Sequence, residues 1–489
     1  MPAFAPRLTI GLLALLAAAC SSADEEALRV AVIGEAGSAF ETGARLAVSG
    51  QLLRAATAQG LVTLDGNGDV VPALAERWIV TDDGLSYIFR LRDGTWPDGT
   101  RLTGEDAATA LRRTLASLRG TPLASDIGRV EEVVARTGRV VELRLASPNP
   151  DLLRVLAQPE LGLLRGNRGS GPMDLERKGD AALLRPYAPP ELGLPEERRW
   201  DDRSRSLRLS TLPAVGAVTS FREGSVQVVL GGKWDSIMLA REVSMVTGSL
   251  QFDPVAGLFG LAFTHGDGFL GEAANREAVA MAIDREALAG ALRAPGWVPT
   301  TRLVSPGMDG DLGTIGERWA DLDLAARRSE AARRVERWRE GRDQAPRLRV
   351  ALPSTPGSGL LFARLRDDFA AVGITARQVG EDEAADLRVI DQVARYPRAQ
   401  WFLGQLACGV RPGPCSPAAD RLAAEARAAA DPRERAALLA EAEAELTLAN
   451  VYVPLGPPVR WTLTRRGLSG LTPNRWAVHP LIAFAVAPR

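Results

Sequence analysis

The stretch from Gly60 to Leu115 constrains the fold more than any other part of the sequence, because it places turns, a strand and a helix start at fixed spacings. Asp82-Asp83-Gly84 is typical of a tight turn, and residues 85–92 alternate in the manner of a strand. Further Asp-Gly turns follow this strand. Thr103, with an aspartate three residues later, is similar to a capping box, so a helix is expected to begin there.

Strand-like and helix-like segments alternate along the remainder of the chain. The strand-like runs are residues 28–33, 87–91, 141–145, 226–230 and 348–352. The helix-like runs, rich in Ala, Leu, Glu and Arg, are residues 107–118, 276–292, 325–340, 361–372 and 417–449. Asp284 is expected to cap the turn that follows it. The 489 residues suffice for roughly two to four domains, and their pattern predicts the α/β class.

Composition excludes several classes of function. Lys+Arg number 59 and Asp+Glu 60, so a surface that binds nucleic acid is not expected. Only two histidines and three cysteines occur, and we expect neither a metal nor a cofactor. The sequence lacks G-x-S-x-G, H-E-x-x-H, C-x-x-C and P-loop motifs, so we expect no enzyme. A hydrolase that uses paired carboxylates stays open, because acidic residues are plentiful.

The N-terminus carries a segment for export. Residues 8–19 form an apolar run that is too short to span a bilayer of about 30 Å but fits a secretory signal. The run ends at Leu16-Ala17-Ala18-Ala19-Cys20, which resembles a bacterial lipobox. We therefore expect residues 1–19 to be a signal peptide and Cys20 to receive a lipid that anchors the protein to the membrane. The alternative is an ordinary signal peptide in which Cys20 is incidental.

The other two cysteines, Cys408 and Cys415, are separated by a loop rich in Pro and Gly. In an oxidising periplasm this spacing favours a local disulfide. Metal binding is the alternative reading, but no histidine or second cysteine pair lies near them in the sequence.

The order of motifs in residues 60–115 resembles the bacterial family-5 extracellular solute-binding proteins, which include the dipeptide- and oligopeptide-binding components of ABC importers. The residues that carry the resemblance are Trp78, Trp96, Asp98, Gly99 and Asp106. Later segments keep the family's order: residues 169–173 are similar to its GTGPY turn, 221–227 to a strand entry, 275–286 to its R-Q-A-x-x-A-I-D-R-E helix and 431–455 to its returning helix and strand. The resemblance extends from about residue 27 to the C-terminus.

The resemblance implies an α/β two-lobe periplasmic binding protein of the Venus-flytrap type, class C, with an extra α/β domain inserted in the first lobe. The expected boundaries are residues 27–47, 168–250 and 456–489 for lobe I, residues 48–167 for the extra domain and residues 251–455 for lobe II. The chain would cross between the lobes near Phe252 and again near Pro454. Two crossings form a hinge, and a solute that contacts both lobes drives its closure.

The resemblance also implies a function. We expect the substrate-binding component of a peptide-class ABC transporter, which captures a peptide or peptide-like solute between the lobes and delivers it to a membrane permease. The protein would be a monomer in the periplasm, held to the membrane through the lipid at Cys20. The alternative is a solute-binding lipoprotein uncoupled from transport, acting as a sensor, scaffold or chaperone. Departures from the family pattern at Met173, Gln227 and Arg395 keep this alternative open.

The expected solute site departs from that of the relatives. Residues 392–403 are similar to a motif of the form W-Y-A-D-Y-P-E-A-S-T-F-L, whose aspartate pairs with the α-amino group of the peptide in oligopeptide-binding members. Arg395 stands at the position of that aspartate. A buried arginine repels an ammonium group and binds carboxylate or phosphate, so we expect a solute that carries an anionic group there. Alternatively, the alignment is out of register, or Arg395 points to solvent or to an internal acid such as Asp391.

Other residues are weaker candidates for contact with the solute. Tyr396 and Trp401 lie in the stretch just described. Ser38 and Phe40 follow the first expected strand, where the family's first lobe meets its ligand, and Trp234 follows a Gly-Gly bend. Aromatic walls suit a cleft that must grip varied side chains, but core packing explains each aromatic residue at least as well.

Overall fold

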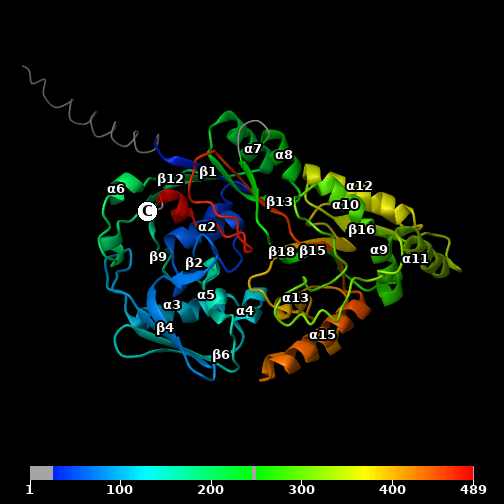
Figure 1. Ribbon diagram of the computed structural model, residues 1–489, viewed down its shortest axis with the longest axis horizontal. Helices are drawn as coiled ribbons and strands as arrows, with labels where there is room; N and C mark the ends of the chain where they lie inside the picture. Colours follow the sequence, from blue (N-terminus) through cyan, green and yellow to red (C-terminus); the bar gives the residue numbers. More distant parts are fainter. Residues whose placement is uncertain (1–25, 245–248, 488–489) are drawn as a thin grey trace, which may run out of the picture.

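The computed structural model describes residues 26–244 and 249–487, so the expected signal peptide and Cys20 lie outside the described residues. Three β-sheets of four or more strands organise this part of the chain, and helices pack around them (Figure 1). Among the described residues, no helix combines the length and the apolar character needed to cross a membrane.

The largest sheet, called sheet A, has seven strands. In spatial order they are β10 (Met173–Lys178), β11 (Ala181–Pro186), β12 (Leu207–Leu212), β1 (Leu28–Ile33), β13 (Val228–Lys233), β20 (Arg460–Thr464) and β14 (Ser249–Phe252). The central strand β1 runs parallel to β12 and β13, and its apolar sequence LRVAVI suits a strand covered on both faces. The helices of this region are α2 (Val48–Thr57), α6 (Trp200–Arg203), α7 (Ala214–Glu223), α8 (Ile237–Ser244) and α16 (Leu481–Ala485).

The second sheet, called sheet B, has five strands. In spatial order they are β17 (Thr375–Val379), β16 (Arg347–Ala351), β18 (Leu387–Val393), β15 (Gly257–Phe263) and β19 (Tyr452–Gly456). The helices that follow these strands in sequence are α9 (Ala273–Ala282), α10 (Arg285–Leu292), α11 (Leu324–Arg339), α12 (Pro356–Ala370), α13 (Ala399–Gln405), α14 (Pro417–Ala428) and α15 (Pro432–Ala449). All seven residues of β15 are buried, and β18 and β19 pair with its two edges.

The third sheet, called sheet C, has four antiparallel strands. In spatial order they are β4 (Ala75–Val80), β5 (Ser86–Leu91), β7 (Val140–Leu145) and β6 (Val130–Ala135). Beside it lie α3 (Gly104–Ser117), α4 (Pro122–Ile127), α5 (Leu152–Leu156) and the two-stranded ribbons β2 (Val62–Leu64) with β3 (Val70–Pro72) and β8 (Leu164–Arg165) with β9 (Arg168–Gly169). The strand expected at residues 85–92 is confirmed as β5, and Thr103 caps α3 by accepting a hydrogen bond from the Asp106 amide.

Two of the expected helices are each divided in two. The run at residues 276–292 is interrupted at Ile283 and Asp284, whose backbones are extended, and Asp284 caps α10 through the Ala287 amide as expected. The run at residues 417–449 ends at Ala428 and resumes at Pro432. A proline cannot continue a helix from the preceding turn but fits the first helical position, so the second helix has to start afresh there.

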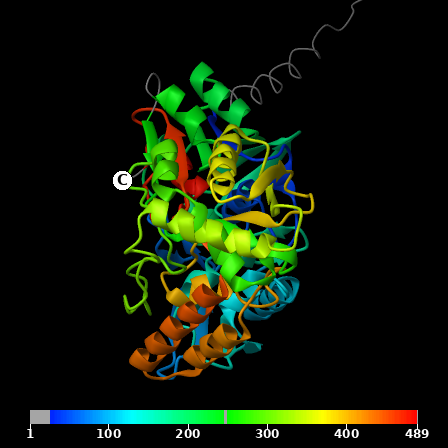
Figure 2. The same ribbon diagram turned by 90° about the vertical axis from the view of Figure 1, so that its right-hand side faces the viewer.

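The chain passes from sheet A to sheet B between β14 and β15, and it returns between β19 and β20. One apolar core joins the two sheets beside these crossings, where the rings of Trp234 and Phe259 lie 5.4 Å apart. Another core joins sheet C to the helices that follow sheet B and contains Phe89 and Trp401. Figure 1 shows α13 beside α4, the helix that lies next to sheet C, and Figure 2 shows the same part of the molecule from the side. Each sheet therefore packs against elements of another.

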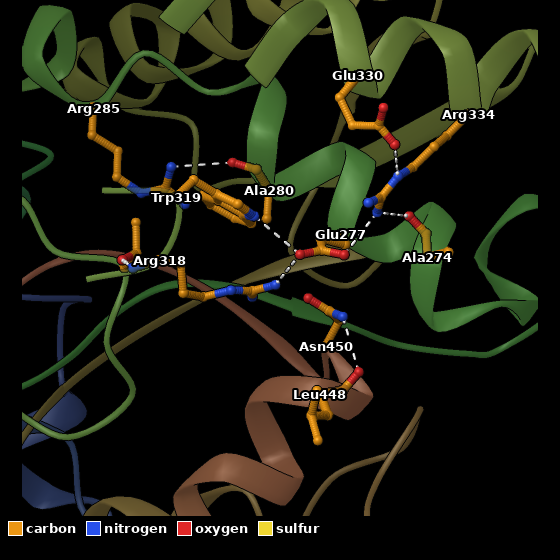
Figure 3. A network of polar contacts seen from close by, with 11 residues as sticks. Ala274, Glu277, Ala280, Arg285, Arg318, Trp319, Glu330, Arg334, Leu448 and Asn450 are labelled. Atoms are coloured by element: carbon orange, nitrogen blue, oxygen red, sulfur yellow. Dashed lines mark hydrogen bonds and ion pairs between the residues drawn. The ribbon is translucent and has the colours of Figure 1, made fainter. Parts of the chain in front are cut away.

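The helices beside sheet B are held by arginines that bond backbone carbonyl groups and by one shared carboxylate (Figure 3). Arg276 is buried and donates to the carbonyl groups of Leu270 and Asn450. Arg285 is also buried, donates to Pro454 and Ala280, and burial lowers its pKa to about 9. These bonds tie α9 to the end of α15, and α10 to β19.

A disulfide joins Cys408 to Cys415, whose Cα atoms are 5.2 Å apart. The loop between them packs against the end of β15. Gly413 has a φ of 113°, and a Cβ atom there would lie 2.2 Å from the Phe263 carbonyl oxygen. Glycine is therefore required for both the backbone conformation and the close approach.

Asp386, directly before β18, forms a network of hydrogen bonds with Arg349 and His265. It accepts hydrogen bonds from the Arg349 amide at 2.6 Å and guanidinium at 2.8 Å, and His265 Nε2 lies 2.7 Å from it. Burial by itself would raise the pKa of this carboxyl, but the bonds from Arg349 and His265 outweigh it and lower the pKa to about 2.

We expect the Asp386→Asn variant to lose about 1 to 2 kcal/mol of stability at neutral pH, allowing for screening by solvent. A depressed carboxyl pKa stabilises the fold above the unfolded-state value of 3.8, and this contribution is lost as the pH falls toward 2. Thermal unfolding followed from neutral to acid pH should therefore show a flatter acid limb for the variant. Asp367→Asn, which removes only the exposed pair with Arg366, serves as the control. Parallel acid limbs for wild type and Asp386→Asn would contradict the assignment.

Candidate functional site

A cavity of about 390 Å³ lies between sheets A and B. On the side of sheet A it is lined by the ends of β13 and β20, and on the side of sheet B by β18 and the residues that follow it. Residues 476–480, β2 and α2 contribute further lining. We call it the interlobe cavity. It adjoins both crossings of the chain, so a movement of one sheet relative to the other would change its shape.

An ion pair between the two sheets forms one wall of the interlobe cavity. Arg460 of β20 donates from Nη1 to Asp391 Oδ1 of β18 at 2.7 Å. Arg460 is also paired in register with Lys233, and two like charges placed opposite each other on neighbouring strands are unfavourable. Asp391 relieves this repulsion, because it brings a carboxylate from the opposite sheet.

The second oxygen of Asp391 has no hydrogen-bond partner among the described residues. The side chain is only 10% exposed, and a buried carboxylate oxygen without a donor is costly. Since Asp391 lines the cavity, a donor from a bound solute would satisfy it. The site can therefore offer a hydrogen-bonded carboxylate to a cationic group.

Arg395 lines the interlobe cavity, but its charge is not free. Its Nη1 donates to Asp126 Oδ2 at the end of α4, and the Tyr396 hydroxyl donates to the other oxygen of Asp126 at 3.1 Å. Arg395 therefore pairs with an acidic residue of the protein, and this residue is Asp126, not Asp391. Arg395 does not require an anionic solute, because Asp126 already neutralises its guanidinium.

A second arginine of the same segment makes a parallel contact. Arg398 pairs with Asp151, which precedes α5, and with Asp309. Burial raises the pKa of both Asp126 and Asp151, and in each case the arginine acts in the opposite direction. The two ion pairs bind the segment before α13 to the helices beside sheet C.

A histidine and an aspartate line the cavity at the first crossing. His479 Nε2 lies 3.0 Å from Asp253 Oδ2, and the other oxygen of Asp253 accepts a hydrogen bond from the Asn474 amide. His479 Nδ1 has no partner among the described residues. This pair fixes residues 474–479 to the crossing between β14 and β15.

Trp401, Trp461 and Trp476 form aromatic parts of the cavity wall. Of these three, only Trp401 was a candidate in the sequence analysis. Trp461 reaches it by lying across Gly232, where a Cβ atom would come within 2.1 Å of the indole. Any other residue at Gly232 would displace this ring. Trp401 is buried and packs edge-on against Phe402 at 5.1 Å, so it serves the core as well as the cavity.

Four of the expected contact residues do not line the interlobe cavity. Ser38 is buried, and its hydroxyl lies 2.8 Å from that of Ser49. Phe40 lies under the Arg177 guanidinium. Trp234 is 3% exposed and packs on Phe259, and Tyr396 is turned to Asp126. Apolar packing and local hydrogen bonds account for all four positions.

The residues that sequence reasoning missed are mainly charged groups on strands. Asp391 interrupts the apolar pattern of β18, LRVIDQV, and this interruption was a usable signal. The sequence around Lys233 and Arg460 gave no such signal, because charged residues are common at the ends of strands. Within the described residues, no group of three or more His, Cys, Asp or Glu side chains is placed to hold a metal ion.

Residues 69–178 match the model of the bacterial extracellular solute-binding proteins, family 5 Middle. The chain is 24% identical over 501 aligned positions to the probable di/tripeptide-binding protein 5 of Pseudomonas aeruginosa, covering 87% of this chain and 89% of that protein. A shorter match of 121 residues is 35% identical to the probable deoxycholate-binding periplasmic protein YgiS of Escherichia coli. It spans 21% of this chain and about a quarter, 23%, of that relative.

Solved structures share the fold along nearly the whole chain. Haemophilus influenzae OppA, in complex with RPPGFSPFR, superposes with a TM-score of 0.80 at 18% identity, covering 95% of this chain and 99% of that one. The Escherichia coli murein tripeptide binding protein MppA superposes with a TM-score of 0.79 at 17% identity, covering 94% of this chain and 98% of that one. The unliganded open form of MppA superposes with a TM-score of 0.64 at 17% identity, covering 95% of this chain and 98% of that one.

The fold and the family match agree about the kind of protein. The α/β architecture is that of the two-lobe periplasmic binding proteins, with sheet A in one lobe and sheet B in the other. Proteins of this family bind solutes and catalyse no reaction, in line with the sequence analysis. The chain therefore carries a match to the bacterial extracellular solute-binding proteins of family 5 over residues 69–178, and it has the fold of the solved peptide-binding proteins along nearly its whole length.

Proposed function

We propose that the protein captures a short peptide or peptide-like solute with a free amino group in the interlobe cavity. The observation that carries this proposal is the unpartnered oxygen of Asp391, which is buried and belongs to a cavity lined by both lobes. A charge-assisted hydrogen bond from an ammonium group would satisfy it. Lys233 on the opposite wall adds a cation that suits the carboxylate end of the same solute.

The size of the cavity favours a small solute. A volume of about 390 Å³ lies near the lower end of the roughly 300–1,000 Å³ typical of small-molecule sites. The P. aeruginosa relative is named for dipeptides and tripeptides, and a solute of that size suits this volume better than a peptide of nine residues. The tryptophans of the wall suit apolar side chains of varied shape.

We further propose that the solute is delivered to the permease of an ABC importer, as in the peptide-class systems. In this proposal residues 27–47, 168–250 and 456–489 form lobe I around sheet A, residues 48–167 form the extra domain around sheet C, and residues 251–455 form lobe II around sheet B. Family 5 binding proteins work outside the cytoplasm, and a lipid at Cys20 would hold this one to the membrane as a monomer. Unchanged uptake of the bound solute in cells lacking the protein would favour the sensor, scaffold or chaperone alternative.

We expect the Asp391→Asn variant to bind a free dipeptide about tenfold to a hundredfold more weakly than wild type. Hydrogen bonds to charged groups contribute about 1.5 to 3 kcal/mol, and the variant loses the charge on one side. The N-acetylated dipeptide, which has no ammonium group, should bind both proteins with equal and low affinity. Isothermal titration calorimetry measures the four combinations.

Arg460→Gln is the matched control for this experiment. It breaks the same ion pair between the lobes but keeps the Asp391 carboxylate. Arg460→Gln should therefore keep or increase the preference for the free peptide over the acetylated one, because the carboxylate loses the cation that neutralises it. Equal losses for both peptides in Asp391→Asn would show that Asp391 acts only through the ion pair, and the proposed recognition of an amino group would be wrong.

A further inference from the structure

A second and larger cavity, of about 780 Å³, opens beside sheet C. It is lined by the β2–β3 ribbon, by the residues that end β5, by residues 187–200 and by the start of α16. Its lining shares Thr63, Leu64 and Pro480 with the interlobe cavity and is otherwise made of different residues. Neither the family match nor the proposed function assigns it a role.

A buried arginine lines this cavity without an acidic partner. Arg92 is 8% exposed and forms no ion pair with any described residue. Its Nη1 donates to the Leu192 carbonyl and its Nη2 reaches Gln59 Oε1 at a long 3.4 Å, while Nε has no partner. Burial lowers the pKa of Arg92, and no nearby carboxylate opposes this shift. A buried, uncompensated cation is costly, so the position favours an anion.

The acidic residues of the same cavity cannot compensate Arg92, because each has partners of its own. Glu76 pairs with Arg90 at 2.8 Å, and Asp93 pairs with Arg101 and Arg139 at 3.0 Å. Asp65 accepts hydrogen bonds from the backbone amides of Asn67 and Asp69, and Glu197 forms an ion pair with Arg203. Among the described residues, Arg92 is therefore the one buried charge of this lining, and it has no acidic partner.

The remainder of the lining is largely apolar. It includes Val71, Pro72, Leu192, Leu194, Pro195 and Ile482. Leu194 is 47% exposed and belongs to the lining of the cavity. A molecule that covered Leu194 and presented an acid to Arg92 would match both features.

We infer that this cavity is a second binding site, which takes a free amphiphilic carboxylate with its acid group on Arg92 and its apolar body along Leu194 and the neighbouring prolines. The apolar surface supplies most of the affinity and the arginine supplies the selectivity for an anion. This inference does not depend on what the interlobe cavity binds.

The test is a calorimetric titration of the purified protein with decanoate below its micellar concentration, with methyl decanoate as the uncharged analogue. Decanoate should bind at one site, at least tenfold more tightly than the ester. Arg92→Gln should remove this preference and leave the titration with the free dipeptide unchanged. Equal affinity for acid and ester, undiminished binding in Arg92→Gln, or no binding of decanoate would each overturn the inference.

Leu194→Asp keeps the inference testable if Arg92→Gln does not fold. Leu194 is exposed, so the change should not affect folding, but it places a negative charge beside the apolar body of the ligand. We expect decanoate to bind at least tenfold more weakly to Leu194→Asp. Leu175→Asp, at an exposed leucine of β10 outside the lining, should bind decanoate like wild type. Unchanged binding to Leu194→Asp would overturn the inference.

Discussion

The Glu277→Ala variant is expected to lower the free energy of unfolding by about 3 kcal/mol or more. Glu277 lies on α9 and accepts hydrogen bonds from Arg318 at 2.8 Å, from the Trp319 indole at 3.0 Å and from Arg334 at 2.7 Å (Figure 3). In this variant the Arg318 side chain would stay largely buried but would lose Glu277, its acidic partner. Removing one partner of a buried ion pair costs about 3 to 5 kcal/mol, because the remaining charge is uncompensated.

Glu330→Ala is the matched control in the same network. Glu330 bonds Arg334 on the same helix, but Arg334 keeps its contact with Glu277 when Glu330 is removed. Its loss should cost less than about 1 kcal/mol, as for other ion pairs near the surface. Urea unfolding followed by tryptophan fluorescence compares the variants. Equal losses for the two would mean that Glu277 is no more than another surface acid.

The Asp126→Asn variant is expected to weaken solute binding by about tenfold to a hundredfold. Asp126 receives hydrogen bonds from Arg395 and Tyr396 across the contact between α4 and the segment before α13. If the lobes open without solute, these bonds exist only in the closed form. Bonds to charged groups contribute about 1.5 to 3 kcal/mol, and a loss confined to the closed form appears in the apparent affinity.

A double-mutant cycle separates this effect from a general loss of stability. Combining Asp126→Asn with Arg395→Gln should weaken binding by less than the product of the two single effects, because both remove the same contact. Glu132→Gln, which changes an exposed pair with Arg144 within sheet C, should bind like wild type. Independent, multiplicative losses in the double variant would contradict a role for this contact in closure.

The local structure could be predicted where neighbouring residues determine it. The cap at Thr103 depends on a residue three positions away, and so does the cap at Asp284. The disulfide closes a loop whose composition is visible in the sequence. The division of the helical run at Pro432 was predictable from the same rule, since a proline after an aspartate is a strong start signal.

The site could be predicted only in part, because its contacts join distant residues. Arg395 lies in the wall of the interlobe cavity, but its partner Asp126 is 269 residues away, in a helix beside another sheet. Aromatic residues gave no guide, since Trp234 and Trp401 look alike in sequence while only Trp401 lines the cavity. Which side of a lobe a side chain faces depends on how the lobes close, and no local pattern contains that information.

The most direct test of the account measures binding and compaction together. Wild-type protein is titrated with free dipeptides and tripeptides and with their N-acetylated forms by calorimetry, and its radius of gyration is followed by small-angle X-ray scattering. We predict that a free peptide binds at one interlobe site, reduces the radius of gyration of an open ligand-free form and binds at least tenfold more tightly than its acetylated form. Equal affinity for the two forms, or binding without compaction, would contradict capture of an amino-bearing solute between closing lobes.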